Sequence, residues 1–442
     1  MSRRSVEWLV LFTLALAAGC STHAQRVRVA REQFYAGNLA QAAELFQEQI
    51  ERHPADADAN ALDLAVIQLL DGRPADAEQT LRVVRDNFDH LEQSDAVEYG
   101  ISMVTDDQRL AYAGANHEKI LTRVMLALAN LMDDGGDAEA YSLQVNAKQQ
   151  ELLQRATGEQ AGDVQLAFAP LAIGPYIHGM IREATFNNYD DATRAYHQVV
   201  SWQPGFQAGK ADFERARTGT HSRPGHGVVY LFALVNRGPV KEEVAELPTT
   251  VALLVADRIL SALGEYELPP TIAPIKVPRV FVPPRSLDSV GLVVNGKFVG
   301  QTETICDVAD LAARQEEVEL PNIMARAVVR RVVKKAAVYA VKDHLEVQEP
   351  LVDLAMTAAG VVWEATEAAD TRCWGLLPRE IQVLRAELPA GSHDVALLPV
   401  TAGRPLSSGP QLRVDVHDGR NTYLLACFPN TQPIGQVLQR SH

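Results

Sequence analysis

The chain has 442 residues, which is enough for two or three domains and a sizeable hydrophobic core. Hydrophobic residues make up 47% and charged residues 22% of the sequence, a balance typical of globular rather than disordered proteins. The formal net charge of -15 argues against binding nucleic acid or anionic lipid over a large surface.

The first twenty residues have the pattern of an export signal. Two arginines precede an apolar run from Trp8 to Ala18, and Gly19 and Cys20 follow. The run is shorter than the roughly 20 apolar residues that span a bilayer. Small residues directly before a cysteine resemble the lipobox of bacterial lipoproteins. We therefore predict that residues 1–19 are a signal peptide and that Cys20 carries lipid; an ordinary signal peptide that contains a cysteine is the alternative.

Lipidation would set the location of the protein. Stable anchoring needs more than one acyl chain, and bacterial lipoproteins carry several. Ser21 follows the cysteine, and by analogy with such lipoproteins this favours the outer membrane of a Gram-negative cell. We expect the body of the protein to face the periplasm.

The next part of the chain contains a repeat. Gly37 and Gly72 stand 35 positions apart, and the same distance separates Ala42 from Ala77. This is the period of tetratricopeptide helix pairs, in which glycine forms the turn and small residues let helices approach closely. Weaker copies follow, as in NNYDDATRAYHQVVSWQP. The pattern predicts a tetratricopeptide-like α-solenoid over residues 20–216, with an unrelated amphipathic bundle as the alternative.

The inner surface of such a solenoid is a place to bind a peptide. Val27, Arg31 and Phe34 follow an i, i+4, i+7 spacing in the first repeat and so share one helix face. We expect these three residues to bind a protein partner. The competing interpretation places Val27 and Phe34 in the core and Arg31 on a solvated face.

The second half of the sequence mixes strands and helices. The loop THSRPGHG ends the helical part, VVYLFALV reads as a buried strand, and Asn295–Gly296 suits a two-residue hairpin turn. Two runs in which apolar and polar residues alternate flank a tight turn at PAGSH. The predicted fold class is α+β, with a mixed α/β domain over residues 227–355. A small β-sandwich-like domain over 356–430 and a tail over 431–442 complete the prediction.

A basic helix is predicted within this half. Pro321 suits an early helix turn, and Arg326, Arg330 and Lys334 recur every four residues on one face. One hypothesis is a stripe that binds phospholipid headgroups or an anionic partner. The other is a core helix whose outer face is simply charged.

Three cysteines remain if Cys20 is lipidated. Cys373 and Cys427 are the plausible disulfide pair in an oxidising compartment, and burial of Cys306, Cys373 and Cys427 as free thiols is the alternative. The sequence has no CxxC or HExxH spacing, so we expect no metal site and no cofactor.

Three stretches carry a family resemblance. They are YAGANHEK, NIMARAVVRRVVKKAA and EAADTRCWGLLPREIQVLRAELPAG, which include Tyr112, Glu118, Asp370, Arg372 and Trp374. With them the mature chain resembles an uncharacterised family of bacterial tetratricopeptide-repeat lipoproteins. Members of that family resemble components of cell-envelope assembly systems, so the resemblance implies a role of this kind.

Two functions follow from these observations. The first is a non-catalytic, lipid-anchored scaffold that binds an envelope protein, with no nucleic acid and no small-molecule substrate. The second is an envelope hydrolase or a direct activator of a peptidoglycan synthase. We find no GxSxG, SxxK or P-loop motif and assign no catalytic residue. Acidic residues such as Glu243, Asp288 and Glu303 near predicted strand ends are the remaining candidates for chemistry. We favour the scaffold.

Overall fold

The structure is a computed structural model that describes residues 21–102, 110–155, 170–263, 273–344 and 368–442. The predicted signal peptide and Cys20 lie outside the described residues. Within the described part, no helix has the length and apolarity that crossing a membrane requires.

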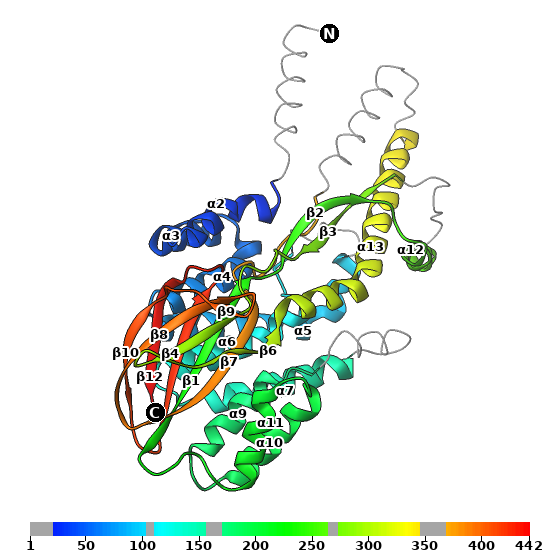
Figure 1. Ribbon diagram of the computed structural model, residues 1–442. Coiled ribbons are helices and arrows are strands. Elements are labelled where there is room, and N and C mark those ends of the chain that lie inside the picture. The colour runs from blue at the N-terminus through cyan, green and yellow to red at the C-terminus, as the bar shows by residue number, and fades with distance from the viewer. Residues whose placement is uncertain (1–20, 103–109, 156–169, 264–272, 345–367) are drawn as a thin grey trace.

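The N-terminal half is a succession of antiparallel helices (Figure 1). Thr22 caps the first of them through a reciprocal pair of hydrogen bonds with Gln25. Gly37 and Gly72 take positive φ values of 84° and 82° after the helices α2 and α4, which is where the repeat predicted a turn. The elements are α2 His23–Tyr35, α3 Leu39–Arg52, η1 Pro54–Asp56, α4 Ala57–Leu70, α5 Pro74–Ser102, α6 Asn116–Met132, α7 Ala138–Arg155, α9 Ile173–Glu183, α10 Tyr189–Trp202 and α11 Gln207–Arg217.

The C-terminal half contains two large sheets and a projecting arm that includes a third, two-stranded sheet. Its elements are β1 His226–Arg237, β2 Val240–Glu246, α12 Thr250–Leu263, β3 Ile275–Phe281, β4 Ser289–Val294, β5 Lys297–Gln301, β6 Glu303–Asp307, α13 Val308–His344, β7 Pro378–Pro389, β8 Gly391–Thr401, β9 Arg404–Pro405, β10 Gln411–Val416, β11 Asn421–Phe428 and β12 Ile434–Ser441. The predicted strand VVYLFALV is β1, and Asn295–Gly296 turns between β4 and β5 with both φ values positive.

The two sheets form a sandwich. One has the order β12-β11-β1-β7-β6 and the other the order β10-β8-β4-β5. In the first sheet β1 and β11 run parallel, and its other neighbours are antiparallel. The prediction of an α+β protein with a β-sandwich is therefore confirmed.

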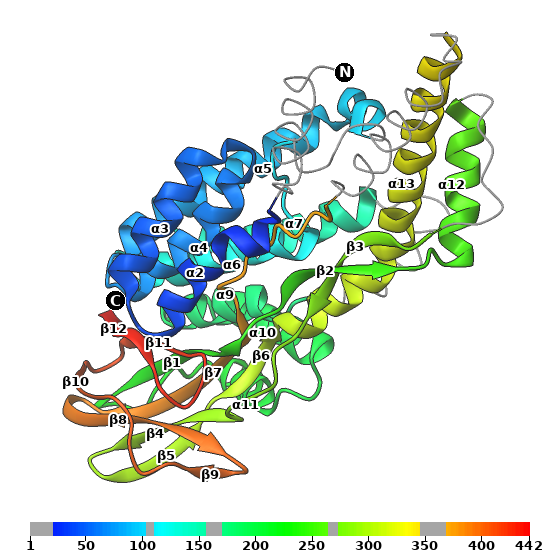
Figure 2. The same cartoon turned by 90° about the horizontal axis from the view of Figure 1, so that it is seen from above.

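The first sheet is also the middle layer of the molecule. Along β1, Tyr230 and Phe232 belong to the hydrophobic core shared with the helices, while Leu231 and Ala233 face the second sheet. Because side chains alternate along a strand, each face of β1 buries a different layer. Figure 2 shows the helices α2–α6 on one side of the strands. The repeats thus cover a sheet made from the other half of the chain.

The arm consists of β2, β3, α12 and the second half of α13. Ala252, Ala256 and Leu260 of α12 pack with Met324 and Val328 of α13 in a small core of their own. The basic helix predicted from the sequence is thus buried on the side that carries Met324 and Val328. Figure 1 shows the arm extending away from the sandwich.

The basic helix begins earlier than the sequence indicated. Pro321 lies inside α13, which starts at Val308, and Asp307 accepts a hydrogen bond from the N–H of Asp310 in the first turn. A proline in a helix removes one backbone hydrogen bond and bends the axis. Figure 1 shows such a change of direction in α13.

The strands also connect regions that the sequence analysis separated. The predicted boundary between 355 and 356 lies outside the described residues, but strands from both sides of it pair in both sheets. The predicted tail over 431–442 contains β12, which pairs with β11 in the first sheet. Local patterns indicate strands but not their partners, which explains both differences.

Candidate functional site

The inner face of the first repeats is occupied by the chain itself. Residues 369–377, here called the inserted segment, lie against α2, α4 and α6 before β7 begins. The segment contains neither helix nor strand. Buried main-chain groups in irregular structure need partners, and the helices provide them.

Two buried carboxylates bind main-chain N–H groups of the inserted segment. Asp63 on α4 accepts a hydrogen bond from the N–H of Leu376 at 2.8 Å, and Glu118 on α6 accepts one from the N–H of Trp374 at 2.7 Å. Both carboxylates are almost fully excluded from solvent. Hydrogen bonds to ionised groups are the stronger kind, so these two contacts hold the segment firmly.

Donors from α2 bind its carbonyl groups. Arg31 donates to the Cys373 carbonyl at 3.3 Å and lies 3.4 Å from Asp63. The hydroxyl of Tyr35 donates to the Gly375 carbonyl at 3.5 Å. A Cβ atom added at Gly375 would lie only 2.0 Å from the guanidinium carbon of Arg31, so any other residue at this position would displace the Arg31 guanidinium.

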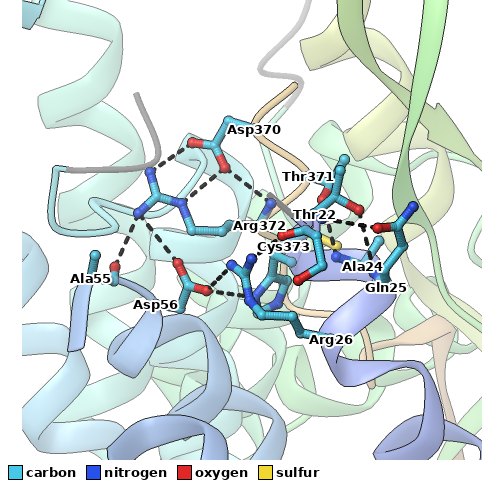
Figure 3. A network of polar contacts seen from close by, with 12 residues as sticks. Thr22, Ala24, Gln25, Arg26, Ala55, Asp56, Asp370, Thr371, Arg372 and Cys373 are labelled. Atoms are coloured by element: carbon cyan, nitrogen blue, oxygen red, sulfur yellow. Dashed lines mark hydrogen bonds and ion pairs between the residues drawn. The ribbon is translucent and has the colours of Figure 1, made fainter. Parts of the chain in front are cut away.

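Arg372 connects three parts of the chain (Figure 3). Its guanidinium forms two hydrogen bonds with Asp370, at 2.7 and 2.9 Å. It also donates to the carbonyls of Ala55 at 3.0 Å and Leu110 at 2.7 Å. Two of the five N–H donors of arginine thus fix the connections before α4 and α6.

The pKa values of the acids near the inserted segment shift in different directions. Burial alone would raise the pKa of Asp370, but the neighbouring charge of Arg372 outweighs it and lowers the pKa to about 2. Burial likewise opposes ionisation of Asp56, and hydrogen bonds from His23 and Arg26 reverse the effect and lower its pKa.

At Asp63, by contrast, burial outweighs the groups that lower the pKa. Its burial raises the pKa to about 6, although the charge of Arg31 and the Leu376 N–H both act to lower it. Desolvation prevails because the carboxylate has no contact with solvent and only one cationic neighbour at 3.4 Å.

The partner-binding residues predicted from the sequence have different positions. Val27 and Phe34 are completely buried in the main core, as the competing interpretation held. Arg31 lies on the inner face, where it contacts the inserted segment rather than solvent. In this structure none of the three is open to another protein, because the inserted segment covers this face of the helices. The pattern of the repeats gave no sign of this segment.

Two of the acidic candidates for chemistry also have structural partners. Glu243 accepts a hydrogen bond from the Ala369 N–H at 2.7 Å and pairs with Lys276. Glu303 accepts hydrogen bonds from the main-chain N–H groups of Gln207 and Ala208 at the start of α11. These contacts account for both carboxylates without a reaction.

The three cysteines that the structure describes are unpaired. Cys306, Cys373 and Cys427 are buried free thiols, so the disulfide between Cys373 and Cys427 is not formed. Within the described ranges, no group of three or more His, Cys, Asp or Glu side chains is placed to hold a metal ion.

Of the residues that hold the inserted segment, only Arg31 was a candidate binding residue on sequence grounds. Asp63 gave one usable signal, because it is a lone acid in the apolar stretch ANALDLAVIQLL. Glu118 and the inserted segment itself lie in two of the stretches that carry the family resemblance, and the structure brings these two stretches together. Tyr112 and Trp374 both bond to Glu118, and Arg372 stands 5.3 Å from the Tyr112 ring centre.

Comparisons with known proteins support the repeat. A family model described as tetratricopeptide repeat matches residues 33–95, which run from the end of α2 into α5. Searches of curated proteins and of solved structures found no match. Tetratricopeptide repeats generally serve as non-catalytic modules for protein–protein interaction. Residues 33–95 of the chain are therefore similar to tetratricopeptide repeats.

Proposed function

We propose that this protein is a non-catalytic scaffold of the bacterial cell envelope. In this proposal lipid on Cys20 anchors it to the periplasmic side of the outer membrane, and its helical repeats bind a protein partner. The observation that supports the scaffold is the tetratricopeptide match over residues 33–95. Within this region Asp63 already binds a polypeptide segment of the same chain through the main-chain N–H of Leu376.

The partner needs a surface that the inserted segment leaves open. A groove of about 410 Å³ lies between α3, α4 and Arg73. Glu44, Glu48 and Glu51 line it from α3, and two of them are exposed. Arg73 is paired with Asp71 and Asp76, so the charge of the groove is predominantly negative.

We assign this acidic groove to a partner segment that carries lysine or arginine. Opposite charges across an interface raise the rate of association and select the partner. The groove lies within the matched repeats, and the same α3 helix uses its other side, through Ala42 and Phe46, to pack in the core. Its negative side is therefore available without disturbing the fold.

A site-specific crosslink tests this assignment. A photoreactive amino acid replaces Gln47, which lines the groove, and crosslinks are formed in intact cells. We expect one dominant adduct whose crosslinked peptide is rich in lysine or arginine. The same amino acid at Lys210 on α11, outside the groove, is the positional control.

A second experiment removes negative charge from the groove. Glu44→Gln with Glu51→Gln should abolish the adduct at position 47. The matched control, Glu214→Gln with Glu317→Gln, removes the same charge from exposed positions elsewhere and should leave it intact. The proposal fails if position 47 forms no adduct, if Lys210 gives the same adducts, or if the two charge variants behave alike.

A further inference from the structure

A second cavity lies beside the inserted segment. It has a volume of about 490 Å³ and is formed by the connection before α6, by β2 and β3, by α13 and by residues 369–372. Tyr112, Asp370 and Arg372 belong both to this cavity and to the contacts of the inserted segment. Its size falls within the range of about 300–1,000 Å³ found for small-molecule sites.

The charge of the cavity opposes that of the whole protein. Five cationic side chains and two carboxylates line it, an excess of three positive charges in a chain of net charge -15. A concave site with one sign of charge and low-dielectric walls concentrates ions of the opposite sign. The cations are Lys241, Lys276, Arg326, Arg330 and Arg372.

Two of these cations form no ion pair with the residues that the structure describes. Lys276 pairs with Glu243 at 3.1 Å, and Arg372 is bound to Asp370. Lys241 and Arg326, by contrast, form no side-chain hydrogen bond or ion pair with any residue that the structure describes. The Nε–H group of Arg326 is buried and donates no hydrogen bond to any described residue, which costs free energy unless a ligand accepts a hydrogen bond from it.

Lys241 remains charged in this position. Its backbone N–H donates to the sulfur of Cys373, which fixes the lysine next to the inserted segment. Burial acts to lower the pKa of Lys241, but nearby carboxylates, above all Glu118 and Asp370, outweigh it and raise the pKa. The amino group is therefore a cation at neutral pH that faces the cavity.

We propose that this cavity binds a phosphate group, with Lys241 and Arg326 as its main ligands. Arginine presents a planar pair of donors that matches phosphate oxygens, and lysine adds a compact positive charge. Because Glu243 offsets Lys276, two positive charges remain in excess, which suits an anion with two negative charges better than a single carboxylate. The phosphate belongs either to a soluble small molecule or to a phospholipid headgroup, and the experiment separates these sources.

The first measurement uses inorganic pyrophosphate and calorimetry. The protein is a chain that begins at Ser21, which contains every described element and carries no lipid. We expect saturable binding with one site per chain, and no heat with sodium chloride of equal ionic strength. Lys241→Met and Arg326→Met keep most of the side-chain length and remove the charge. Each should weaken binding at least about tenfold, which corresponds to ~1.4 kcal/mol.

Further variants make the result specific. Lys297→Met removes an exposed cation from β5, remote from the lining of the cavity, and should leave binding unchanged. Arg326→Lys keeps the charge without the planar donor pair and should bind with intermediate affinity. Thermal melting of every variant shows whether the fold is retained; Arg326→Lys continues the test if a methionine variant unfolds.

The second measurement is cosedimentation with vesicles of phosphatidylcholine, with and without phosphatidylglycerol. Sedimentation that needs phosphatidylglycerol and disappears in the Lys241 and Arg326 variants assigns the site to a lipid headgroup. Pyrophosphate binding without sedimentation assigns it to a soluble phosphate compound. The proposal is overturned if neither probe binds, or if the Lys241 and Arg326 variants bind as strongly as Lys297→Met.

Discussion

The carboxylate of Asp63 accepts a hydrogen bond at 2.8 Å from the main-chain N–H of Leu376, which lies 313 positions later in the sequence. With the matching contact between Glu118 and the N–H of Trp374, it fastens the start of β7 to the repeats. Helical and β-rich halves are thus joined by hydrogen bonds to main-chain groups as well as by apolar packing. The stability of one half should therefore depend on residues in the other.

Trp374 is the first residue to test for this dependence. Its side chain is 1% exposed and belongs to the core shared by helices and sheet. Trp374→Ala should lower the free energy of unfolding by about 3–5 kcal/mol, because a large apolar side chain is lost and a cavity remains. Urea unfolding measures the change. Leu254→Ala, at a position 61% exposed on α12, is the control and should have little effect. Equal stability of the two variants would contradict burial of the tryptophan.

Arg372 should matter through its ion pair with Asp370, whose side chain is 24% exposed. Arg372→Met removes that ion pair and two hydrogen bonds to main-chain carbonyls, so we expect a loss of roughly 1–3 kcal/mol in the free energy of unfolding. Arg217→Met breaks an exposed pair with Glu214 and should cost at most about 1 kcal/mol. A double-mutant cycle with Asp370→Ala isolates the coupling. Additive effects of the two single changes would show that the pair contributes nothing.

Asp63 should make stability depend on pH. Its pKa is raised to about 6 in the folded protein, against about 3.9 in an unfolded chain. The folded state therefore holds this proton more tightly, and the stability it contributes is present below about pH 4 and lost as pH rises to about 6. Asp63→Asn removes this dependence.

The measurement for Asp63 is the difference in unfolding free energy between wild type and Asp63→Asn at several pH values. That difference should fall between about pH 4 and pH 6 and stay constant above this range. A difference independent of pH would show that the Asp63 pKa is not raised.

Thiol reactivity tests whether the three cysteines are buried and free. Cys306, Cys373 and Cys427 are free and buried, and burial raises the pKa of each thiol. A chain that begins at Ser21 should react with a thiol reagent only slowly when native and at all three cysteines in denaturant without a reductant. One reactive thiol in denaturant would instead reveal a disulfide.

Lipidation of Cys20 can be tested in cells. Replacing Cys20 by Ser removes the thiol that would carry lipid, so incorporation of labelled palmitate should disappear and the protein should leave the membrane fraction. Replacement of the neighbouring Ser21 by Ala leaves the cysteine in place and is the control for incorporation. Label that persists in the Cys20→Ser protein would remove the basis for a lipid anchor.

Several features followed from the sequence because they depend on local chemistry. Gly37 and Gly72 mark turns that need positive φ, and the 35-residue spacing around them identifies the helix pairs. Asn295–Gly296 likewise specifies a tight hairpin. In each case the residues that form the structure are neighbours in the chain.

Tertiary structure alone decided what covers each surface. Periodicity shows that Val27, Arg31 and Phe34 share a helix face, but not that residues 369–377 occupy the space in front of it. The parallel pairing of β1 with β11 and the meeting of Glu118 with Trp374 join positions about 200 or more residues apart. Such contacts are selected by the free energy of the whole fold, because burial and hydrogen bonding of one segment depend on where all the others lie.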